Sequence, residues 1–528
     1  MRIALTAFLV VIAAGSAASS AAITGHTYVP ASQSEVQAGR GASALPEGEL
    51  ERYLANLTQT HVFDAFDGMN EALKAASATH EPLRVARTFP VEVGPDMLFG
   101  KPFADGAWQV HQTVITSVDA EALRLRVDLA SLDAQAEVYV IDLLGARAFG
   151  PYTFADHVEG GRWLPTTVGD TAVLLVRTTS ASAPLVRLIE LAHFYWDFSE
   201  LKELSCNVDA ACETDPTIQE LSSGVGVLVI PYGGGEFAIC SGCLLENADT
   251  PEQEPYFLTA NHCIATAMDA VQTDVIWDFR TSACDADDAP SFSALPHSDV
   301  ADLLETSSRL DATLLLLGDV PVGDYGRAYL GWDTREPAVG ESIIGLHYPQ
   351  GTYLRISHGR VEAIDQVVYS GGLDVYRRQT RVVWDEGVTE PGSSGSCLLF
   401  DDGTYGVLGA LSNGEQHTCG EDRSGNIDNY ASFRDFFPSV EGYLTGTTPP
   451  RPRRCPARRV FKDRPEVLAG LRAFRDKGLR SSGLGVLAIA AYYDAAPYLV
   501  DVVEASPAAR VLFIGAATPF AAVGRALP

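Results

Sequence analysis

Three polar side chains, each at the end of an apolar segment or in a tight turn, could together carry out acyl transfer. His262 lies near the end of the segment YFLTANHC, and Asp311 begins the very apolar segment DATLLLL. Ser394 lies in the middle of the glycine-flanked turn GSSGS. A serine hydroxyl needs a neighbouring base, imidazole titrates near neutral pH, and a buried carboxylate can fix the imidazole tautomer. The residue types therefore predict a nucleophile, a general base and an orienting acid.

Each of the three has an ordinary structural explanation when taken alone: a core histidine, a turn-capping aspartate and a flexible loop. Their order, His262, Asp311, Ser394, at separations of 49 and 83 residues, suits two successive small β-barrels with the site in the cleft between them. The glycines would let the N–H groups of Gly392 and Ser394 converge as an oxyanion hole, worth ~3 kcal/mol per donor. We expect acyl-bond hydrolysis without a metal or organic cofactor. The optimum should be neutral to alkaline, because His262 must be unprotonated.

Length and composition limit what surrounds these residues. The chain of 528 residues is too long for one hydrophobic core, and 46% hydrophobic with 20% charged residues is ordinary globular usage. A net charge of −30 argues against nucleic acid as a partner, because bulk charge would repel the phosphates. Protein or peptide substrates fit the predicted chemistry.

The N-terminus predicts export. A positive charge at Arg2 precedes the apolar run from Ile3 to Ala14, and small residues follow as far as Ala22. This pattern is typical of a secretory signal peptide over residues 1–22. The alternative is a membrane anchor, but the run is shorter than the ~20 residues that span a bilayer. We expect a secreted protein, extracellular or periplasmic, in which disulfides can form.

The remaining chain divides by pattern into three parts, and mainly β structure is expected. Residues 23–202 form a predicted pro-region, polar and partly helical at first, with a β-sandwich of short alternating strands at about 85–198. The sandwich would assist folding or inhibit the next domain, with a carbohydrate-binding or adhesion module as the alternative. Residues 203–445 carry the predicted chemistry, and residues 446–528 form a Pro/Arg-rich linker and a short helical tail.

Six motifs in the central part resemble, in order, those of the bacterial lysyl endopeptidases, which belong to the chymotrypsin-like class. They are NVDAACETD (207–215), YFLTANHC (256–263), DATLLLL (311–317), GLHYPQG (345–351), RIS (355–357) and EGVTEPGSSGSC (386–397). The likeness covers nearly half of the chain. It implies a double β-barrel serine endopeptidase that follows an N-terminal pro-region.

The resemblance also suggests how substrate would be selected. Trypsin-like enzymes carry an acidic residue six positions before the nucleophile, where this chain has Val388. Lysyl endopeptidases use an aspartate nine residues after a downstream cysteine, and Asp428 follows Cys419 at that spacing. Asp428 would meet a substrate ammonium, the alternative being a solvated charge. Glu390 is a secondary candidate for the pocket wall.

Three departures from the family pattern affect these expectations. The family's pocket tryptophan is replaced around Tyr369 and its pocket histidine by Ser412, so specificity for basic residues is a safer prediction than specificity for lysine alone. Ser393 replaces the aspartate that traps a new N-terminus in trypsin-like zymogens, so activation by N-terminal insertion is not expected.

Lys202 lies near the start of the family's mature chain and could be a self-cleavage site.

Nine cysteines fit the same interpretation. The resemblance implies three disulfides, which are Cys240–Cys263, Cys212–Cys284 and Cys206–Cys419. In two-barrel proteases the strand before the histidine runs beside the strand that leaves the serine, so we predict a fourth bridge between Cys243 and Cys397. Cys455 is left over in the linker.

The tail differs from the rest in charge. Residues 451–528 contain 13 basic and 6 acidic residues, a net charge of +7. The segments CPARR, LRAFRDKGL and AYYDAAPYLVD are similar to the "CFI-box" tails of some exported bacterial proteins. The tail could contact a cell surface or membrane interface, or form a small helical cap. The alternative for the whole protein is a non-catalytic surface or binding protein on a degenerate protease scaffold.

Overall fold

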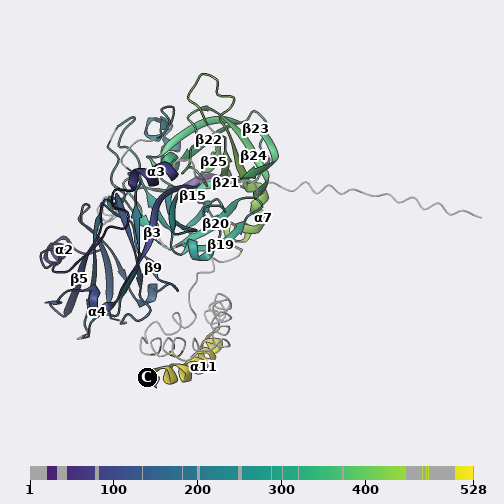
Figure 1. Ribbon diagram of the computed structural model, residues 1–528. Coiled ribbons are helices and arrows are strands. Elements are labelled where there is room, and N and C mark those ends of the chain that lie inside the picture. Colours follow the sequence, from purple (N-terminus) through teal and green to yellow (C-terminus); the bar gives the residue numbers. More distant parts are fainter. Residues whose placement is uncertain are drawn as a thin grey trace, which may run out of the picture.

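The computed structural model describes most of the chain between residues 21 and 447, and the helix near the C-terminus (Figure 1). The described ranges are 21–31, 44–77, 82–447 and 506–526, with three isolated residues at 467, 471 and 474; within 82–447 the gaps are 134, 181, 199–202, 248–252, 287, 300, 319, 371–373 and 416. The predicted signal peptide up to residue 20, Lys202 and Cys455 lie outside the described residues.

Two sheets form the β-sandwich. One contains β2 (Thr60–Phe63), β4 (Phe103–Asp105), β5 (Trp108–Ser117), β7 (Glu137–Asp142), β8 (Arg147–Tyr152) and β11 (Thr171–Thr178). The facing strands are β3 (Leu83–Val93), β6 (Ala122–Asp128), β9 (Arg162–Trp163), β10 (Thr167–Val168) and β12 (Arg187–Phe194). Alternating apolar residues of both sheets, such as Leu125, Val140 and Leu174, meet in one core. The sandwich extends further toward the N-terminus than expected, because β2 pairs with β5.

Two further sets of strands form the predicted double β-barrel, so the expected fold class is confirmed. The first set contains β14 (Val225–Tyr232), β15 (Glu236–Leu245), β16 (Tyr256–Thr259), β17 (Asp274–Trp277), β18 (His297–Ser298), β19 (Ala301–Ser307) and β20 (Ala312–Leu317). The second contains β22 (Ser342–His347), β23 (Arg355–Ser370), β24 (Asp374–Glu386), β25 (Cys397–Phe400), β26 (Val407–Gly414) and β27 (Ile427–Ser432), which pair in a closed ring. Each set encloses its own apolar core.

Short elements complete these layers. Among the described residues the helices are α2 (Glu47–Leu54), α3 (Asn70–Ser77), α4 (Pro95–Leu98), α5 (Pro216–Ser222), α6 (Ala267–Ala270), α7 (Phe433–Leu444) and, in the tail, α11 (Pro507–Ala526). The strand β21 (Arg327–Asp333) connects the two barrels, and β13 (Val208–Asp209) pairs with β23. Helix α7 packs Phe433 and Phe437 against Trp332 of β21.

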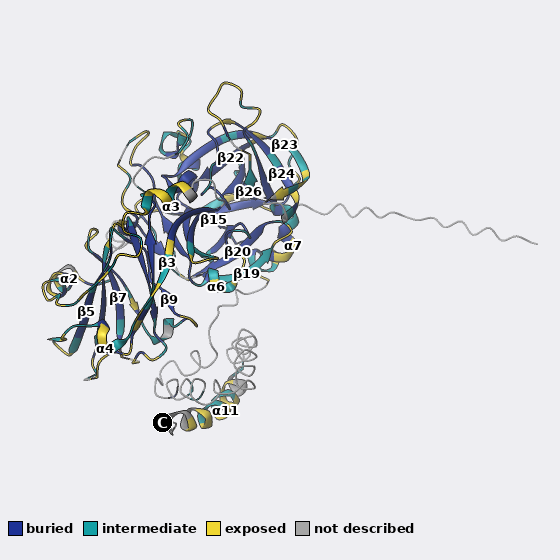
Figure 2. Ribbon diagram, viewed as in Figure 1, coloured by how far each residue is buried: buried dark blue, intermediate teal, exposed yellow. Residues whose placement is uncertain are grey.

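The sandwich and the first barrel share a buried interface rather than a flexible contact (Figure 2). Strand β3 pairs with β12 on one edge and with β15 on the other, so one sheet runs from the sandwich into the barrel. Arg124 of β6 is fully buried and donates to the carbonyls of Leu164, Val229 and Gln272. Burial lowers the pKa of Arg124 to about 10, so the guanidinium stays charged at neutral pH. Arg124 therefore joins the sandwich to the first barrel, because Leu164 belongs to the former and Val229 and Gln272 to the latter.

A strand lies where only polar, partly helical structure was expected. β1 (Ala22–Val29) pairs antiparallel with β21 of the protease part. Its polar side chains have specific partners, because His26 contacts Glu220 and Thr27 donates to Glu246. These partners are distant in sequence, and the segment shows no clear alternation of apolar and polar residues. The strand therefore depends on tertiary contacts that a local pattern does not show.

Apart from Ser506 and three isolated residues, the described part of the tail is helix α11. None of the helices in the described part of the chain is long and apolar enough to cross a membrane. The apolar stretch 483–503 and most of the basic segment 471–477 lie outside the described residues.

Candidate active site

His262 and Asp311 are brought together by two neighbouring strands. His262 follows β16 and Asp311 precedes β20, and these strands pair antiparallel with Thr259 opposite Thr313. The His262 Nδ1 lies 2.8 Å from Asp311 Oδ2, and the His262 backbone N–H donates to Oδ1 at 2.8 Å. Asp311 is fully buried, and its φ of 66° lies in the left-handed region that aspartate tolerates. Oδ2 thus orients the imidazole ring, and Oδ1 fixes the backbone that carries it.

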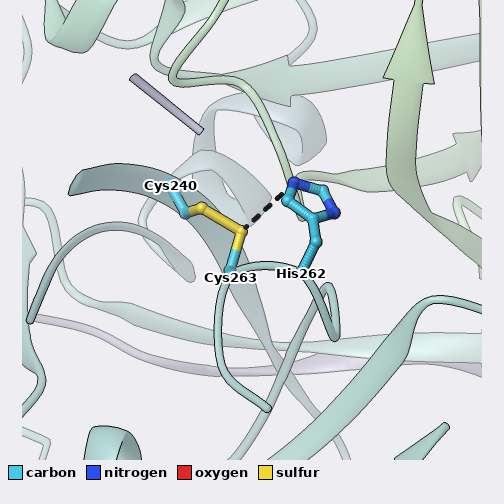
Figure 3. Close-up of side chains that lie close together, drawn as sticks. All are labelled: Cys240, His262 and Cys263. Atoms are coloured by element: carbon cyan, nitrogen blue, oxygen red, sulfur yellow. Dashed lines mark hydrogen bonds between the residues drawn. A yellow bond between two sulfur atoms is a disulfide. The ribbon is translucent and has the colours of Figure 1, made fainter. Parts of the chain in front are cut away.

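A disulfide supports the other side of the histidine (Figure 3). Cys240 of β15 bonds to Cys263, and Cys263 Sγ lies 3.7 Å from His262 Nε2. The same sulfur lies 3.7 Å from the carbonyl oxygen of Ser394. The loop that carries His262 is therefore fastened both to β15 and against the serine turn.

The turn that contains Ser394 has the geometry that its glycines imply. Gly392 and Gly395 have φ values of 103° and 81°, which a residue with a Cβ rarely adopts. Ser241 of β15 fastens the turn, since its N–H donates to Ser394 O at 2.7 Å and its hydroxyl to Gly392 O at 3.0 Å. Within the described residues, the N–H groups of Gly392 and Ser394 donate to no other group. Both donors are therefore available to an oxyanion.

His347, to which no sequence motif gave a role, contacts the serine turn. Its Nδ1 is 2.8 Å from the hydroxyl of Ser393, and its Nε2 is 3.0 Å from the hydroxyl of Ser357. Burial lowers the pKa of His347 to about 3, so the ring is neutral. His347 lies in the motif GLHYPQG, but no sequence pattern links this histidine to Ser393.

Asp428 is buried among polar side chains. Its side chain is fully buried, and Oδ2 accepts hydrogen bonds from Trp384 Nε1 at 2.5 Å and from Thr389 Oγ1 at 2.6 Å. Val388, at the position that is acidic in trypsin-like enzymes, is also buried. The alternative of a solvated surface charge at Asp428 does not match this burial.

A second histidine that sequence reasoning missed faces Asp428. The Nε2 of His417 lies 3.1 Å from Asp428 Oδ1, and its Nδ1 lies 2.5 Å from the carbonyl oxygen of Thr389. Burial alone would lower the pKa of His417, but Asp428 and the Thr389 carbonyl raise it to about 9. His417 lies in a polar, acidic stretch without periodicity, so only the tertiary structure reveals it.

Glu390 is tied to the segment that follows Lys202. Its Oε2 accepts from the Leu204 N–H at 2.8 Å and from Asn207 Nδ2 at 2.7 Å, and Gln350 Nε2 lies 3.4 Å from its Oε1. Burial raises the pKa of Glu390. These contacts connect the expected processing junction with the serine turn, whereas a role for Glu390 in the pocket wall stays a prediction.

The two positions that depart from the family pattern differ in exposure. Tyr369 is 73% exposed near the end of β23, whereas Ser412 is buried in β26. The Ser412 hydroxyl has no hydrogen-bond partner among the described residues. The Tyr369 ring therefore faces solvent.

All four predicted cysteine pairs lie at bonding distance. The S–S distances are 2.14 Å for Cys206–Cys419, 1.87 Å for Cys212–Cys284, 2.00 Å for Cys240–Cys263 and 1.97 Å for Cys243–Cys397. In the described part of the chain, two groups combine cysteine with another metal-ligand type, and each contains one of these disulfides. Their sulfurs are bonded to each other and so offer no thiolate to a metal.

Comparison with known proteins agrees with the motifs. Residues 202–431 match the family model of the lysyl endopeptidase C-terminal domain. The double barrel is thus similar in sequence to the lysyl endopeptidase C-terminal domain. A lysyl endopeptidase from Pseudomonas aeruginosa is 31% identical over 248 residues, which are 46% of this chain and 52% of that protein. The chain thus spans about half the length of the curated relative that it matches.

Solved protease structures have lower sequence identity to this chain. The active form of the Rv3671c protease from M. tuberculosis is 13% identical, with a TM-score of 0.31, over 46% of this chain and 92% of that one. The HtrA-type protease AlgW with a tripeptide is 14% identical, with a TM-score of 0.29, over 43% of this chain and 62% of that one.

Proposed function

We propose that this protein is a secreted serine endopeptidase, made as a precursor, that hydrolyses peptide bonds after basic residues, with lysine preferred. The contact of His262 with a fully buried Asp311, beside the glycine turn of Ser394, is the observation that carries the proposal. The lysyl-endopeptidase-like sequence supports it.

The arrangement suggests a role for each residue. Ser394 Oγ would attack the substrate carbonyl while His262 Nε2 takes its proton, and Asp311 would stabilise the imidazolium. The oxyanion would accept from the N–H groups of Gly392 and Ser394. His262 would then give the proton to the leaving amine, and water would release the acyl group by the reverse steps.

A covalent probe tests this proposal directly. A fluorophosphonate requires an activated serine, so we expect one label on the processed protein, at Ser394 in the peptide mass map. His262→Ala should lose the label although Ser394 remains, and exposed Ser424 should stay unlabelled in both. The loss of peptide hydrolysis in His262→Ala should parallel the loss of the label. An unlabelled protein that hydrolyses no peptide would favour the alternative, a non-catalytic surface or binding protein.

Processing at Lys202 follows from the same proposal. An enzyme that cuts after lysine could release its own pro-region there, and N-terminal sequencing of the processed form should begin at Glu203. Lys202→Ala should accumulate the precursor, whereas Lys202→Arg should mature if arginine is accepted. Normal maturation of Lys202→Ala would contradict self-cleavage at this position.

A further inference from the structure

One oxygen of the carboxylate at the proposed pocket base is already hydrogen-bonded within the chain itself. Trp384 and Thr389 both donate to Asp428 Oδ2, and both donors are neutral. The other oxygen, Oδ1, faces His417 Nε2 at 3.1 Å. The side chains of His417 and Asp428 are 3% and 0% exposed, so solvent does not screen this pair.

The partners of His417 determine its protonation. Thr389 O is a carbonyl oxygen and can only accept, so Nδ1 must carry a hydrogen. Asp428 Oδ1 is a carboxylate oxygen, so a bare Nε2 would place two lone pairs against each other at 3.1 Å. Both ring nitrogens are therefore protonated, and the imidazole is a cation. The contact is an ion pair rather than an aligned hydrogen bond, since neither atom has a hydrogen-bond partner among the described residues.

We propose that His417 is a specificity-determining residue, the resident counter-ion of Asp428, and that a substrate lysine is strongly selected only after His417 has lost its proton. This inference rests on the proposed function. With His417 protonated, the pair has no net formal charge, and an incoming ammonium would be desolvated without an unpaired anion to receive it. With His417 neutral, Asp428 presents its full charge to the substrate.

The pH dependence has a defined sign. The pKa of His417 is raised to about 9, so the counter-ion is present below that pH and is lost as the pH rises through it. Two other titratable groups in the described part of the chain interact with the pair, His347 of β22 and Tyr430 of β27. Burial lowers the pKa of His347 to about 3 and raises the pKa of Tyr430 well above its usual value, so both stay neutral as His417 titrates. A substrate lysine keeps its charge until about pH 10.4. Selectivity for lysine over an uncharged side chain should therefore rise with pH. Protonation of His262 affects both substrates equally and cancels in their ratio.

The test compares kcat/KM for a peptidyl-lysyl amide and its norleucyl counterpart, which has the same carbon chain without the ammonium. For the wild-type processed protein, the ratio should rise roughly tenfold between about pH 7 and about pH 9.5. His417→Gln should already show the raised ratio at neutral pH, without this rise. Asp428→Asn should select neither substrate at any pH. An equal ratio and equal pH dependence in wild type and His417→Gln would overturn the inference.

A measurement that needs no activity separates the inference from the proposed function. In NMR titrations of histidine-labelled Ser394→Ala, one imidazole should titrate near pH 9, and this signal should be missing when His417→Gln is added. A His417 that is neutral at pH 7 would overturn the inference even in a fully active enzyme. The absence of Ser394-dependent hydrolysis of both amides would instead reject the proposed function.

Discussion

Ser394→Ala is expected to lower kcat for a lysyl amide roughly 10⁶-fold, with the fold and all four disulfides unchanged. The reason is that no other hydroxyl can form the acyl-enzyme at this point. Ser394 is 4% exposed, and its backbone oxygen is held by Ser241, so the alanine methyl fits the same turn. The measurement is steady-state hydrolysis by the processed protein, with near-UV circular dichroism to confirm the fold.

The matched control is Ser424→Ala. Ser424 is exposed, and its hydroxyl donates only to Asp422 in a surface turn. We expect kcat within about twofold of wild type for this control, as for most surface substitutions. A Ser394→Ala protein that retained a tenth or more of the wild-type kcat would contradict the assignment of Ser394 as nucleophile.

The fold class could be predicted because its signals are local. Short alternating strands separated by turns indicate a sandwich or barrel, and the structure confirms the double barrel. The order and spacing of His262, Asp311 and Ser394 predicted two successive barrels with the site between them. In the structure β16 and β20 of the first barrel place His262 Nδ1 and Asp311 Oδ2 2.8 Å apart. The assignment of their catalytic roles stays a prediction until the variants are measured.

The residues that sequence reasoning missed act through distant partners. His417 is 11 residues from Asp428 along the chain, but it meets Asp428 only because β26 and β27 fold back on each other. His347 reaches Ser393 across 46 residues. A buried ion pair leaves no periodic pattern, because each member is a single polar residue in an otherwise ordinary segment. The family resemblance therefore indicated Asp428 as a candidate pocket acid, but no sequence pattern indicated that His417 faces it.

Asp311→Asn is expected to lower kcat about 10⁴-fold without unfolding the protein. The asparagine oxygen can still accept from the His262 backbone N–H, which Asp311 Oδ1 now does at 2.8 Å. The amide nitrogen would then face Nδ1, where Oδ2 now accepts. Two donors cannot face each other, so the proton of His262 would move to Nε2, and that nitrogen could no longer take the proton of Ser394.

Backbone strain should not contribute to the effect of Asp311→Asn, because asparagine tolerates the left-handed φ of 66° as well as aspartate does. Asp365→Asn is the matched control, since Asp365 also has a positive φ of 55° but pairs with Arg378 on an exposed hairpin. We expect the control to keep wild-type kcat and both variants to keep wild-type circular dichroism. A loss of less than about tenfold in Asp311→Asn would mean that another group orients His262, because a reversed tautomer removes the base altogether.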